Sequence, residues 1–395
     1  MTDAILALNA GSSSIKFALY RAGIGHDPTL ASRGQVEGIG STPHFVARSP
    51  DGTTLKEQSW AEAAPSFQSL LETVLAWIES HLGADTLIGV GHRIVHGGID
   101  HDRPERVTAA LLSALDDLVP LAPLHQPHNI APIRAIAATR PNLPQVACFD
   151  TAFHRTMPAV ATRIALPHAF AEAGVRRYGF HGISYEYIAR RLREVAPGLA
   201  EGRTIVAHLG NGASLCALQA GRSIETTMGF TALDGLVMGT RCGMLDPGVV
   251  LYLQQARGMS AKQIEDMLYR QSGLLALSGG VASDMRTLLA SPDPRAQEAI
   301  ALFVYRIVQL TGAQTSILGG LDGLVFTAGI GERAPAIRDR VCAGLRWLGV
   351  ELDPEANARN DAVISTPQSR VSIRVIPTDE EAMIARHTLQ VIRPG

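Results

Sequence analysis

One short pattern occurs twice in this chain, once near its start and once beyond its middle. Residues Ile5 to Leu19 read ILALNAGSSSIKFAL, and residues Thr204 to Leu218 read TIVAHLGNGASLCAL. In each segment an apolar strand runs into a tight turn rich in Gly, Asn and Ser, and a second alternating strand follows. A chain of 395 residues exceeds the length at which one hydrophobic core stops growing. We therefore expect two similar halves, each with one such hairpin.

Between and after these hairpins, short β-type runs alternate with longer helical patterns, which favours an α/β or α+β protein. Apolar residues recur at helical spacing from Phe67 to Ile78, and Gly83 supplies a stop. Further helix starts are predicted at Ser260 with Gln263 as a capping box, at Asp293 with Pro294, and at Pro335.

Composition excludes several classes of protein. With 46% hydrophobic residues, 18% charged residues and a net charge of -2, the chain resembles an ordinary folded protein. The few lysines are scattered and form no basic run, so no nucleic-acid partner is expected. No stretch reaches the roughly 18 apolar residues of a membrane span, and no positively charged leader precedes the first strand. The four cysteines form no CxxC pair, which fits a reducing compartment. We expect a cytoplasmic protein without a membrane partner.

A third glycine-rich segment, GLVFTAGIGE, covers Gly323 to Glu332. It reads as a buried strand that ends in a glycine pair and runs into the helix at Pro335. Backbone N–H groups at such turns and helix starts bind anions. Gly329, Gly331 and Ala334 also match a GxGxxA dinucleotide fingerprint. We rank this alternative low, because that fingerprint normally belongs to the first βα unit of its domain.

The remaining polar residues suit phosphoryl transfer, which requires cations around the moving group, a metal on the polyphosphate and an acceptor held in line. The candidates are Arg93 in GHRIVHGG, Asp150 in FDTAFH, His181 in YGFHGIS, His208 and Asn211 in HLGNGAS, Arg241 in MGTRCG, and Asp284 with Arg286 in SDMR. Arg93 ends an apolar strand pattern, where an uncompensated guanidinium is costly, so a site role is favoured over a structural ion pair. A structural role is favoured for most of His92, His96, His125, His128 and His154, and no spacing supports a zinc site.

These motifs resemble those of acetate kinases, the acetokinase family. The resemblance rests on nine ordered motifs between Asn9 and Ala385: ALNAGSSSIKF, GHRIVHGG, FDTAFH, YGFHG, HLGNGAS, MGTRCGMLDPG, SDMR, TAGIGE and PTDEEAMIA. It implies the α/β fold of the actin/sugar-kinase superfamily, with two duplicated ribonuclease-H-like domains, a nucleotide cleft between them and a homodimer. The expected domains are residues 1–149 with 383–395, and residues 150–382.

The resemblance also implies an activity, the reversible, direct in-line transfer of the γ-phosphoryl group of ATP to acetate, giving ADP and acetyl phosphate. The implied cofactor is Mg²⁺, for which Mn²⁺ substitutes, near Asn9 and Glu380. Arg93 would hold the carboxylate, and His181 and Arg241 would stabilise charge in the transition state. The nucleotide and its phosphates would meet Ser12, Ser14, Lys16, His208, Leu209, Gly210, Asn211, Gly212, Asp284, Met285, Arg286, Gly329, Ile330, Gly331, Glu332 and Arg333.

The family assigns acid/base work to Asp150, and here chemistry suggests another role. A carboxylic acid acceptor is already ionised at neutral pH, so it needs no general base to attack phosphorus. We expect Asp150 to orient Arg93, Arg241 or a metal-bound water instead.

Two positions depart from the family pattern. Ala232 stands where these kinases read proline in FTPLEG, so the acyl pocket, with Val95, Leu124 and Phe180 as its other walls, has room for propionate. Arg333 replaces the asparagine that usually follows GIGE, so a different phosphoryl donor remains open.

Several alternatives remain at this stage. Propionate or butyrate kinase is the nearest to acetate kinase. A sugar kinase or a polyphosphate hydrolase fits less well, because Arg93 and Arg241 suit a charged acceptor better than a hydroxyl group or water. An ATP-binding regulatory or scaffold protein with a dead site is disfavoured by the intact set of polar residues.

Overall fold

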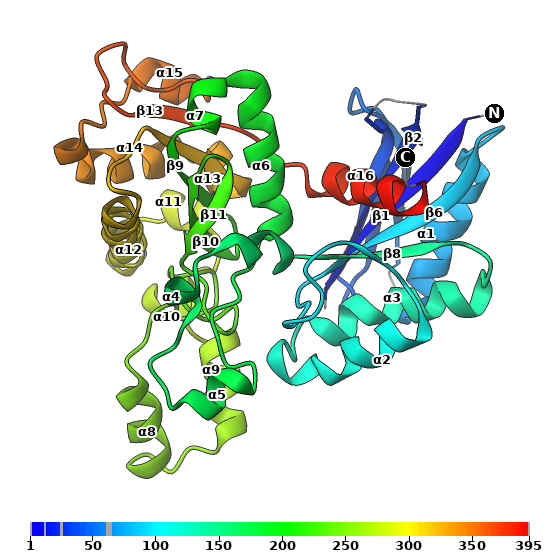
Figure 1. Cartoon of the computed structure of the whole chain (residues 1–395), viewed down its shortest axis with the longest axis horizontal. Helices are drawn as coiled ribbons and strands as arrows, with labels where there is room; N and C mark the ends of the chain where they lie inside the picture. Colours follow the sequence, from blue (N-terminus) through cyan, green and yellow to red (C-terminus); the bar gives the residue numbers. More distant parts are fainter. Residues whose placement is uncertain (1, 12, 24–26, 61–64, 394–395) are drawn as a thin grey trace. The chain divides into compact units, whose positions relative to one another are not determined.

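The computed structural model describes residues 2–11, 13–23, 27–60 and 65–393. The chain forms two compact units (Figure 1), one made of Met1–Phe153 and Asp379–Gly395 and the other of His154–Thr378. Each division lies a few residues from the limits expected from the sequence, 149/150 and 382/383. Asp150 and Glu380 therefore belong to the first unit.

The first unit contains an eight-stranded sheet with the order β5-β4-β3-β2-β1-β6-β8-β7. Strand β1 pairs antiparallel with β2 and parallel with β6, and β6 pairs parallel with β8. The carboxyl ends of β1, β6 and β8 consequently lie at one edge of the sheet. The strands are β1 (Asp3–Ala10), β2 (Ser14–Ala22), β3 (Thr29–Glu37), β4 (His44–Arg48), β5 (Thr54–Ser59), β6 (Thr86–Ile94), β7 (Glu105–Arg106) and β8 (Gln145–Phe149).

Helices cover both faces of this sheet. They are α1 (Phe67–His81), α2 (Ala109–Asp117), α3 (Gln126–Thr139) and α16 (Glu380–Ile392), with a short 3-10 turn η1 (Val119–Leu121). The first helix predicted from the sequence is confirmed as α1: the Ser66 hydroxyl accepts from the backbone N–H of Ser69 at its start. Its leucines, such as Leu70, pack with Leu6 and Leu8 of β1 in one core.

Helix α16 lies against the other face of the first sheet. A Cβ atom on Gly91 would lie 2.1 Å from the hydroxyl oxygen of Thr388, so only glycine lets the helix approach β6 this closely. Because side chains alternate along a strand, Arg93 stands on the same face as Gly91, towards α16. Asn9 of β1 stands on that face as well, since Leu6 and Leu8 occupy the opposite one. The alternation of side chains along β1 and β6 thus places Asn9 and Arg93 on the face of the sheet where α16 begins.

The second unit contains a five-stranded sheet with the order β11-β10-β9-β12-β13. Strand β9 is antiparallel to β10 and parallel to β12, and β12 is parallel to β13. The same order and directions occur in β3-β2-β1-β6-β8 of the first unit. The duplication expected from the two hairpins is therefore confirmed, as is the α/β fold. The strands are β9 (Arg203–Leu209), β10 (Ala213–Gln219), β11 (Arg222–Thr226), β12 (Gly323–Thr327) and β13 (Ser372–Val375).

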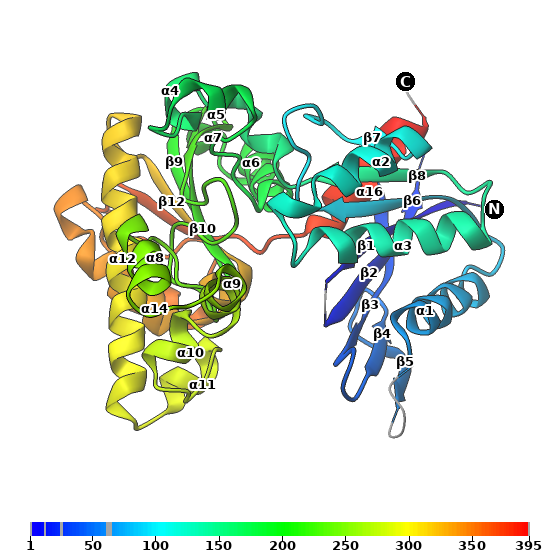
Figure 2. The same ribbon diagram turned by 90° about the horizontal axis from the view of Figure 1, so that it is seen from below.

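The helices of the second unit include the long α12 and, on the other side of the sheet, α6 (Figure 2). All three helix starts predicted here are confirmed: Ser260 and Gln263 form a capping box, Asp293 caps α12, and Pro335 opens α14. The helices are α4 (Ala159–Thr162), α5 (His168–Glu172), α6 (Gly182–Val195), α7 (Pro197–Ala200), α8 (Pro247–Gln255), α9 (Ala261–Arg270), α10 (Gly273–Leu277), α11 (Met285–Ala290), α12 (Pro294–Leu318), α13 (Ala328–Arg333), α14 (Pro335–Gly344) and α15 (Pro354–Arg359), with 3-10 turns η2 (Ala152–Thr156) and η3 (Arg346–Leu348).

One expectation about the glycine segment is wrong. The strand ends at Thr327, and both Gly329 and Gly331 lie inside the short helix α13. Ala328 adopts a left-handed conformation with φ of 63°, which turns the chain abruptly from strand into helix.

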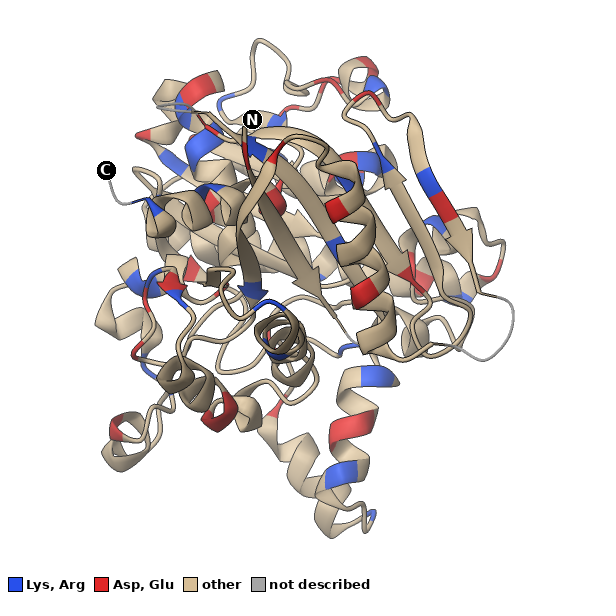
Figure 3. Cartoon of the chain, turned by 90° about the vertical axis from the view of Figure 1, so that its right-hand side faces the viewer, with Lys and Arg blue, Asp and Glu red and all other residues tan. Residues whose placement is uncertain are grey.

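The surface carries charge of both signs. Lys, Arg, Asp and Glu are interspersed along the helices in view (Figure 3). Among the described residues, no helix combines the length and the apolar character needed to cross a bilayer.

Candidate active site

The first unit gathers polar side chains around Arg93, near the carboxyl end of β6. Its guanidinium donates to both oxygens of Asp150, which follows β8, with Nε 3.0 Å and Nη2 2.6 Å from Oδ2. Nη1 lies 3.4 Å from Oδ1 of Asn9, and Nε lies 3.8 Å from Oε2 of Glu380. The Asp150 side chain is 1% exposed and that of Arg93 is 19% exposed. A fixed cation therefore reaches solvent at the edge of the sheet.

Electrostatics keep this guanidinium charged. Burial alone would lower the pKa of Arg93, but the charges of Asp150 and Glu380 and the hydrogen bond to Asp150 raise it above its usual value. The group is thus a permanent positive charge whose plane is set by a buried carboxylate, which suits the recognition of a carboxylate or a phosphate.

The first hairpin places Lys16 beside Asn9. The two residues are direct partners in the pairing of β1 with β2, so they share one face of the sheet. Lys16 is exposed, and Ser14 begins β2, with its carbonyl accepting from Gly11 N at 2.8 Å to close the turn. Ser12, which was predicted to contact phosphate, lies outside the described residues.

The start of α16 is strongly acidic. Asp379, Glu380 and Glu381 follow one another there, and burial together with the charge of Glu380 raises the pKa of Glu381. No group of three or more His, Cys, Asp or Glu side chains in the described part of the chain has the geometry of a metal cage. The amide oxygen of Asn9 and the carboxylate of Glu380 nevertheless fit Mg²⁺, which binds to few protein oxygens and keeps several waters.

The second unit contributes two stacked imidazoles. The rings of His181 and His208 lie 4.1 Å apart, centroid to centroid, at an interplanar angle of 16°. His181 precedes α6 in a left-handed conformation with φ of 57°, and His208 lies in β9. Both side chains are buried. Both rings are therefore fixed in one orientation, which supports the site role expected for these two histidines.

Arg241 and His181 converge on Gly212 in the turn that follows β9. A Cβ atom on Gly212 would lie 2.7 Å from Nη2 of Arg241 and 3.1 Å from Nε2 of His181. Arg241 is held from the other side, where its Nη1 donates to the carbonyl oxygen of Ala232 at 2.8 Å. Glycine at 212 thus leaves the room in which a cationic and an imidazole group approach each other.

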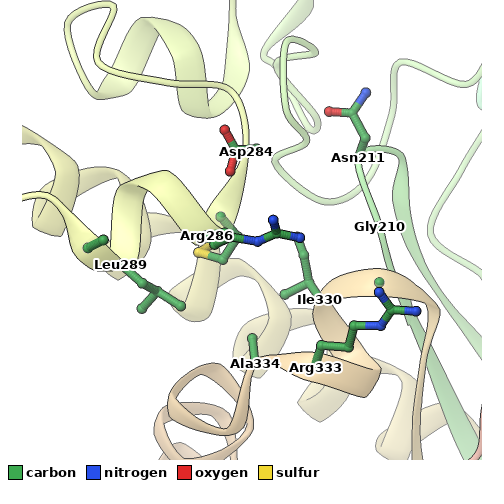
Figure 4. A pocket seen from close by; sticks show the side chains of 11 residues that line it. Gly210, Asn211, Asp284, Arg286, Leu289, Ile330, Arg333 and Ala334 are labelled. Carbon is green, nitrogen blue, oxygen red and sulfur yellow. The ribbon is translucent and has the colours of Figure 1, made fainter. Parts of the chain in front are cut away.

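A pocket of about 520 Å³ lies in the second unit (Figure 4). Three segments that the sequence singled out separately line it: the turn after β9, the start of α11 and helix α13. Leu289 lies at the end of the pocket away from Asn211 (Figure 4). Its size and its mixture of apolar and cationic walls suit a nucleotide. The lining residues are Gly210, Asn211, Asp284, Met285, Arg286, Leu289, Ala290, Gly329, Ile330, Arg333 and Ala334.

Other residues predicted to contact the nucleotide lie outside this lining. Leu209 is buried within β9, and Gly331 packs against the backbone of Phe326. The carboxylate of Glu332 accepts from the backbone N–H of Thr378 at 3.2 Å. The lining residues that sequence reasoning missed are Leu289, Ala290 and Ala334. A signal for Leu289 existed in its position one helical turn after Met285 and Arg286.

The four residues predicted to line the acyl pocket are divided between the units. Val95 and Leu124 belong to the first unit, and Phe180 and Ala232 belong to the second. Val95 and Phe180 are buried, and Leu124 and Ala232 are half-buried.

Two of the remaining histidines have structural roles, as favoured from the sequence. His92 is buried against the side-chain oxygen of Gln145 at 2.7 Å. His154 bonds to Ser223 through Nδ1 and to the carbonyl oxygen of Phe180 through Nε2, both at 2.9 Å.

A duplicated α/β fold with a nucleotide-sized pocket and a set of half-buried, oriented cations suits a phosphotransferase whose acceptor is anionic. The profile of the acetokinase family matches residues 4–386. An acetate kinase from Rhodopseudomonas palustris is 55% identical over the full length of both chains. The crystal structure of Porphyromonas gingivalis acetate kinase superposes with a TM-score of 0.85 at 36% identity, covering 99% of this chain and 100% of that one. A propionate kinase from Francisella tularensis superposes with a TM-score of 0.90 at 36% identity, covering 98% and 100%. The chain therefore belongs to the acetokinase family, whose members transfer a phosphoryl group to a carboxyl group.

Proposed function

We propose that the protein is an acetate kinase that reversibly transfers the γ-phosphoryl group of ATP to acetate by direct in-line displacement. The observation that carries this proposal is the Arg93 guanidinium, oriented by Asp150 yet partly open to solvent. Such a group binds a small carboxylate in two parallel hydrogen bonds. The pocket with Arg286 and Arg333 supplies the donor side. Residues 1–153 with 379–395, and residues 154–378, are proposed as the two domains of the kinase.

The chemistry needs positioning and charge stabilisation rather than proton transfer. Acetate is ionised at neutral pH and attacks phosphorus without a base. Arg93 holds it in line, and Arg241 with His181 and His208 stabilises the negative charge that spreads over the moving phosphoryl oxygens. Lys16 and Ser14 of the first hairpin are proposed to bind the transferred phosphate as well. A Mg²⁺ ion held through Asn9 and Glu380 would neutralise charge on the polyphosphate.

Trapping of acyl phosphate as the hydroxamate tests the reaction directly. The purified protein is incubated with ATP, Mg²⁺ and hydroxylamine, and with acetate, propionate, butyrate, glucose or no acceptor. Hydroxamate is expected with acetate and should require both ATP and Mg²⁺. ADP release that is independent of any acid would indicate a hydrolase, and release that depends on glucose would indicate a sugar kinase.

Propionate is a second candidate substrate, and Ala232 is the observation that favours it. Alanine at this position has a smaller side chain than the proline that acetate kinases usually carry, and one methylene in an apolar pocket is worth about 1 to 3 kcal/mol. We expect the ratio of kcat/KM for propionate to that for acetate to fall in Ala232→Pro. The proposed widening of the pocket would be rejected if the Ala232→Pro variant remained active with acetate and this ratio stayed the same.

We also propose a homodimer in the cytoplasm, where ATP is available. Helix α8 buries none of its residues within the chain, and Leu251 and Tyr252 on it are 53% and 55% exposed. Met244, Leu245 and Val249 extend this apolar surface, which a second copy of the chain would cover. Light scattering is expected to give the dimer mass for the native chain and the monomer mass for Leu251→Asp. The same mass for both would argue against this interface.

A further inference from the structure

Two serines hold the stacked histidines of the second unit in a crossed arrangement. His208 of β9 and Ser214 of β10 are direct partners in the hairpin, so their side chains share the face of the sheet that α6 contacts. Ser214 Oγ lies 2.8 Å from Nδ1 of His181, at the start of α6. Ser184 Oγ, in the first turn of α6, lies 2.9 Å from Nδ1 of His208. Each histidine is thus fixed by a serine from the opposite element.

Each serine is backed by a second hydroxyl group. The Tyr185 hydroxyl lies 2.5 Å from Ser214 Oγ, and Thr378 Oγ1 lies 2.8 Å from Ser184 Oγ. Tyr185, Ser184 and Ser214 are fully buried. Burial raises the pKa of the Tyr185 phenol well above its ordinary value, so the phenol keeps its proton.

One series of hydrogen bonds runs from Tyr185 through Ser214 to His181, and the direction of each bond can be assigned from the groups that carry protons. Because the buried phenol keeps its proton and Ser214 Oγ lies 2.5 Å away, we assign the Tyr185 hydroxyl as the donor and Ser214 Oγ as the acceptor. The hydrogen of the Ser214 hydroxyl then points to Nδ1 of His181, and an imidazole that accepts at Nδ1 carries its proton on Nε2. Two imidazolium rings stacked at 4.1 Å would repel each other, which disfavours the state in which both rings are charged. The Arg241 guanidinium across Gly212 disfavours a positive charge on His181 as well.

Both Nε2 atoms face the turn between β9 and β10. A Cβ atom on Gly212 would lie 3.1 Å from Nε2 of His181, and one on Gly210 would lie 3.8 Å from Nε2 of His208. Gly210 lines the nucleotide pocket. The charged and titratable groups that face His181 include the His208 ring from β9, the Tyr185 phenol from α6 and, across Gly212, the Arg241 guanidinium.

We propose that Tyr185 with Ser214, and Thr378 with Ser184, are positioning residues that present His181 and His208 to the phosphoryl group as neutral rings. In this arrangement Nε2–H of His181 donates a hydrogen bond to a phosphoryl oxygen and transfers no proton. The inference rests on the proposed kinase function, because it assigns a role within that site. It adds four hydroxyl residues that reach the phosphate only through the histidines.

Tyr185→Phe is the sharpest test, because it removes one hydroxyl group and little else. Long-range proton–nitrogen correlation spectra of protein labelled with ¹⁵N-histidine report which ring nitrogen is protonated. His181 of the native enzyme is expected to be protonated on Nε2 from about pH 6 to 8. In Tyr185→Phe, Ser214 is released to accept from Nδ1, so a population protonated on Nδ1 should appear. The kcat value should fall roughly 10- to 100-fold and become lower at acidic pH, while both KM values change less than about threefold.

Two internal references accompany this test. Tyr178→Phe removes another buried phenol, one that donates to the Gly174 carbonyl at 2.7 Å, and should leave the His181 signals unchanged. His154 donates through Nε2 to a backbone carbonyl and should keep its signals in every variant.

Several outcomes would overturn the inference. These are a native His181 protonated on Nδ1, a Tyr185→Phe spectrum identical to the native one, or a loss of kcat without any spectral change. If Tyr185→Phe does not fold, Thr378→Val tests the second series of hydrogen bonds, from Thr378 through Ser184 to His208. The position of the proton on the His208 ring and the change in kcat are then judged by the same criteria. If native protein forms no hydroxamate but its spectra are as expected, the kinase proposal fails and the positioning of the rings stands.

Discussion

The Arg93 guanidinium meets the Asp150 carboxylate side-on, with Nε and Nη2 both directed at the buried acid. This geometry orients the arginine plane, and we propose that orientation of Arg93, rather than proton transfer, is the role of Asp150. The acceptor of the reaction is already ionised, so an orienting role is also the one that the chemistry requires.

The first prediction concerns Asp150→Asn. Loss of the charged partner should lower kcat/KM for acetate at least about 30-fold, equivalent to about 2 kcal/mol, without a new pH dependence and without loss of the Mg²⁺ requirement. Steady-state kinetics from pH 6 to 9 measure this. The matched control is Asp322→Asn, because Asp322 holds Arg203 side-on in the same way at the surface, at 2.7 and 3.0 Å. A new ionisation in the pH profile of Asp150→Asn would restore the acid/base assignment.

The second prediction concerns Gly212→Ala. The added methyl group would lie 2.7 Å from the end of the Arg241 side chain, which is flexible, so the protein should fold while Arg241 is displaced. We expect kcat to fall by about 100-fold or more, and the dissociation constant of ATP to remain within about threefold because Gly212 does not line the pocket. Gly198→Ala is the control, since a Cβ atom there meets nothing within 4 Å. Near-native kcat in Gly212→Ala would show that Arg241 and His181 need not converge.

The third prediction concerns Arg338, a fully buried arginine of α14. It donates to the Gly331 carbonyl in α13 at 2.8 Å, and to Asn357 and Asn360 beyond α14, at 2.6 to 2.8 Å. Arg338→Met removes the donor to all of these acceptors, and only the Asn357 carbonyl keeps a second one, the backbone N–H of Asn360 at 3.1 Å. The free energy of unfolding should therefore fall by roughly 3 kcal/mol. The KM for ATP should also rise, because α13 forms a wall of the nucleotide pocket.

Denaturation in urea and nucleotide kinetics measure both effects of Arg338→Met. The exposed Arg340, on the same helix, provides the control Arg340→Met, which should change stability by less than about 0.5 kcal/mol. An unchanged KM for ATP in Arg338→Met would limit its role to stability.

The fourth prediction concerns the stability of the fold in acid. Burial lowers the pKa of His92 from 6.5 to about 4, so the folded protein keeps this ring neutral. Between those two pH values the unfolded chain binds a proton that the folded chain does not, so stability is lost as the pH falls from 6.5 towards 4. The contribution approaches about 1.4 kcal/mol per pH unit.

Unfolding free energies of the native chain and His92→Gln at pH 7, 6 and 5 test this contribution. The variant should lose less stability on acidification than the native chain does. Parallel slopes for the native chain and His92→Gln would contradict the assignment.

Local patterns in the sequence were sufficient to predict several elements of this structure. The repeated strand–turn–strand layout anticipated β1–β2 and β9–β10, and local capping residues such as Ser260 and Asp293 anticipated helix starts. The structure also brings together Asn211, Asp284 to Arg286, and Gly329, Ile330 and Arg333, from three segments singled out separately. All three segments lie at ends of strands or helices, which meet at this pocket.

Other features could not be read from the sequence, because their partners lie far away along the chain. Ser214 looks like an ordinary strand serine until β10 places it opposite α6, where it meets His181. Thr378 reaches Ser184 from 194 residues away. The end of β12 at Thr327 was not predicted, because no pattern in the sequence indicates that Ala328 adopts a left-handed conformation.

Helix α16 has a consequence for the order in which the protein is made. It packs on β1 and β6, where Gly89 and Gly91 of β6 leave it room, yet it follows the entire second unit in the chain. During translation, the second unit can close as soon as β13 has left the ribosome, whereas the first sheet keeps one apolar face bare until the last helix emerges. The first unit, which carries Arg93, is therefore completed last. A nascent chain stalled before Glu380 would leave the face of the first sheet that α16 covers open to chaperones.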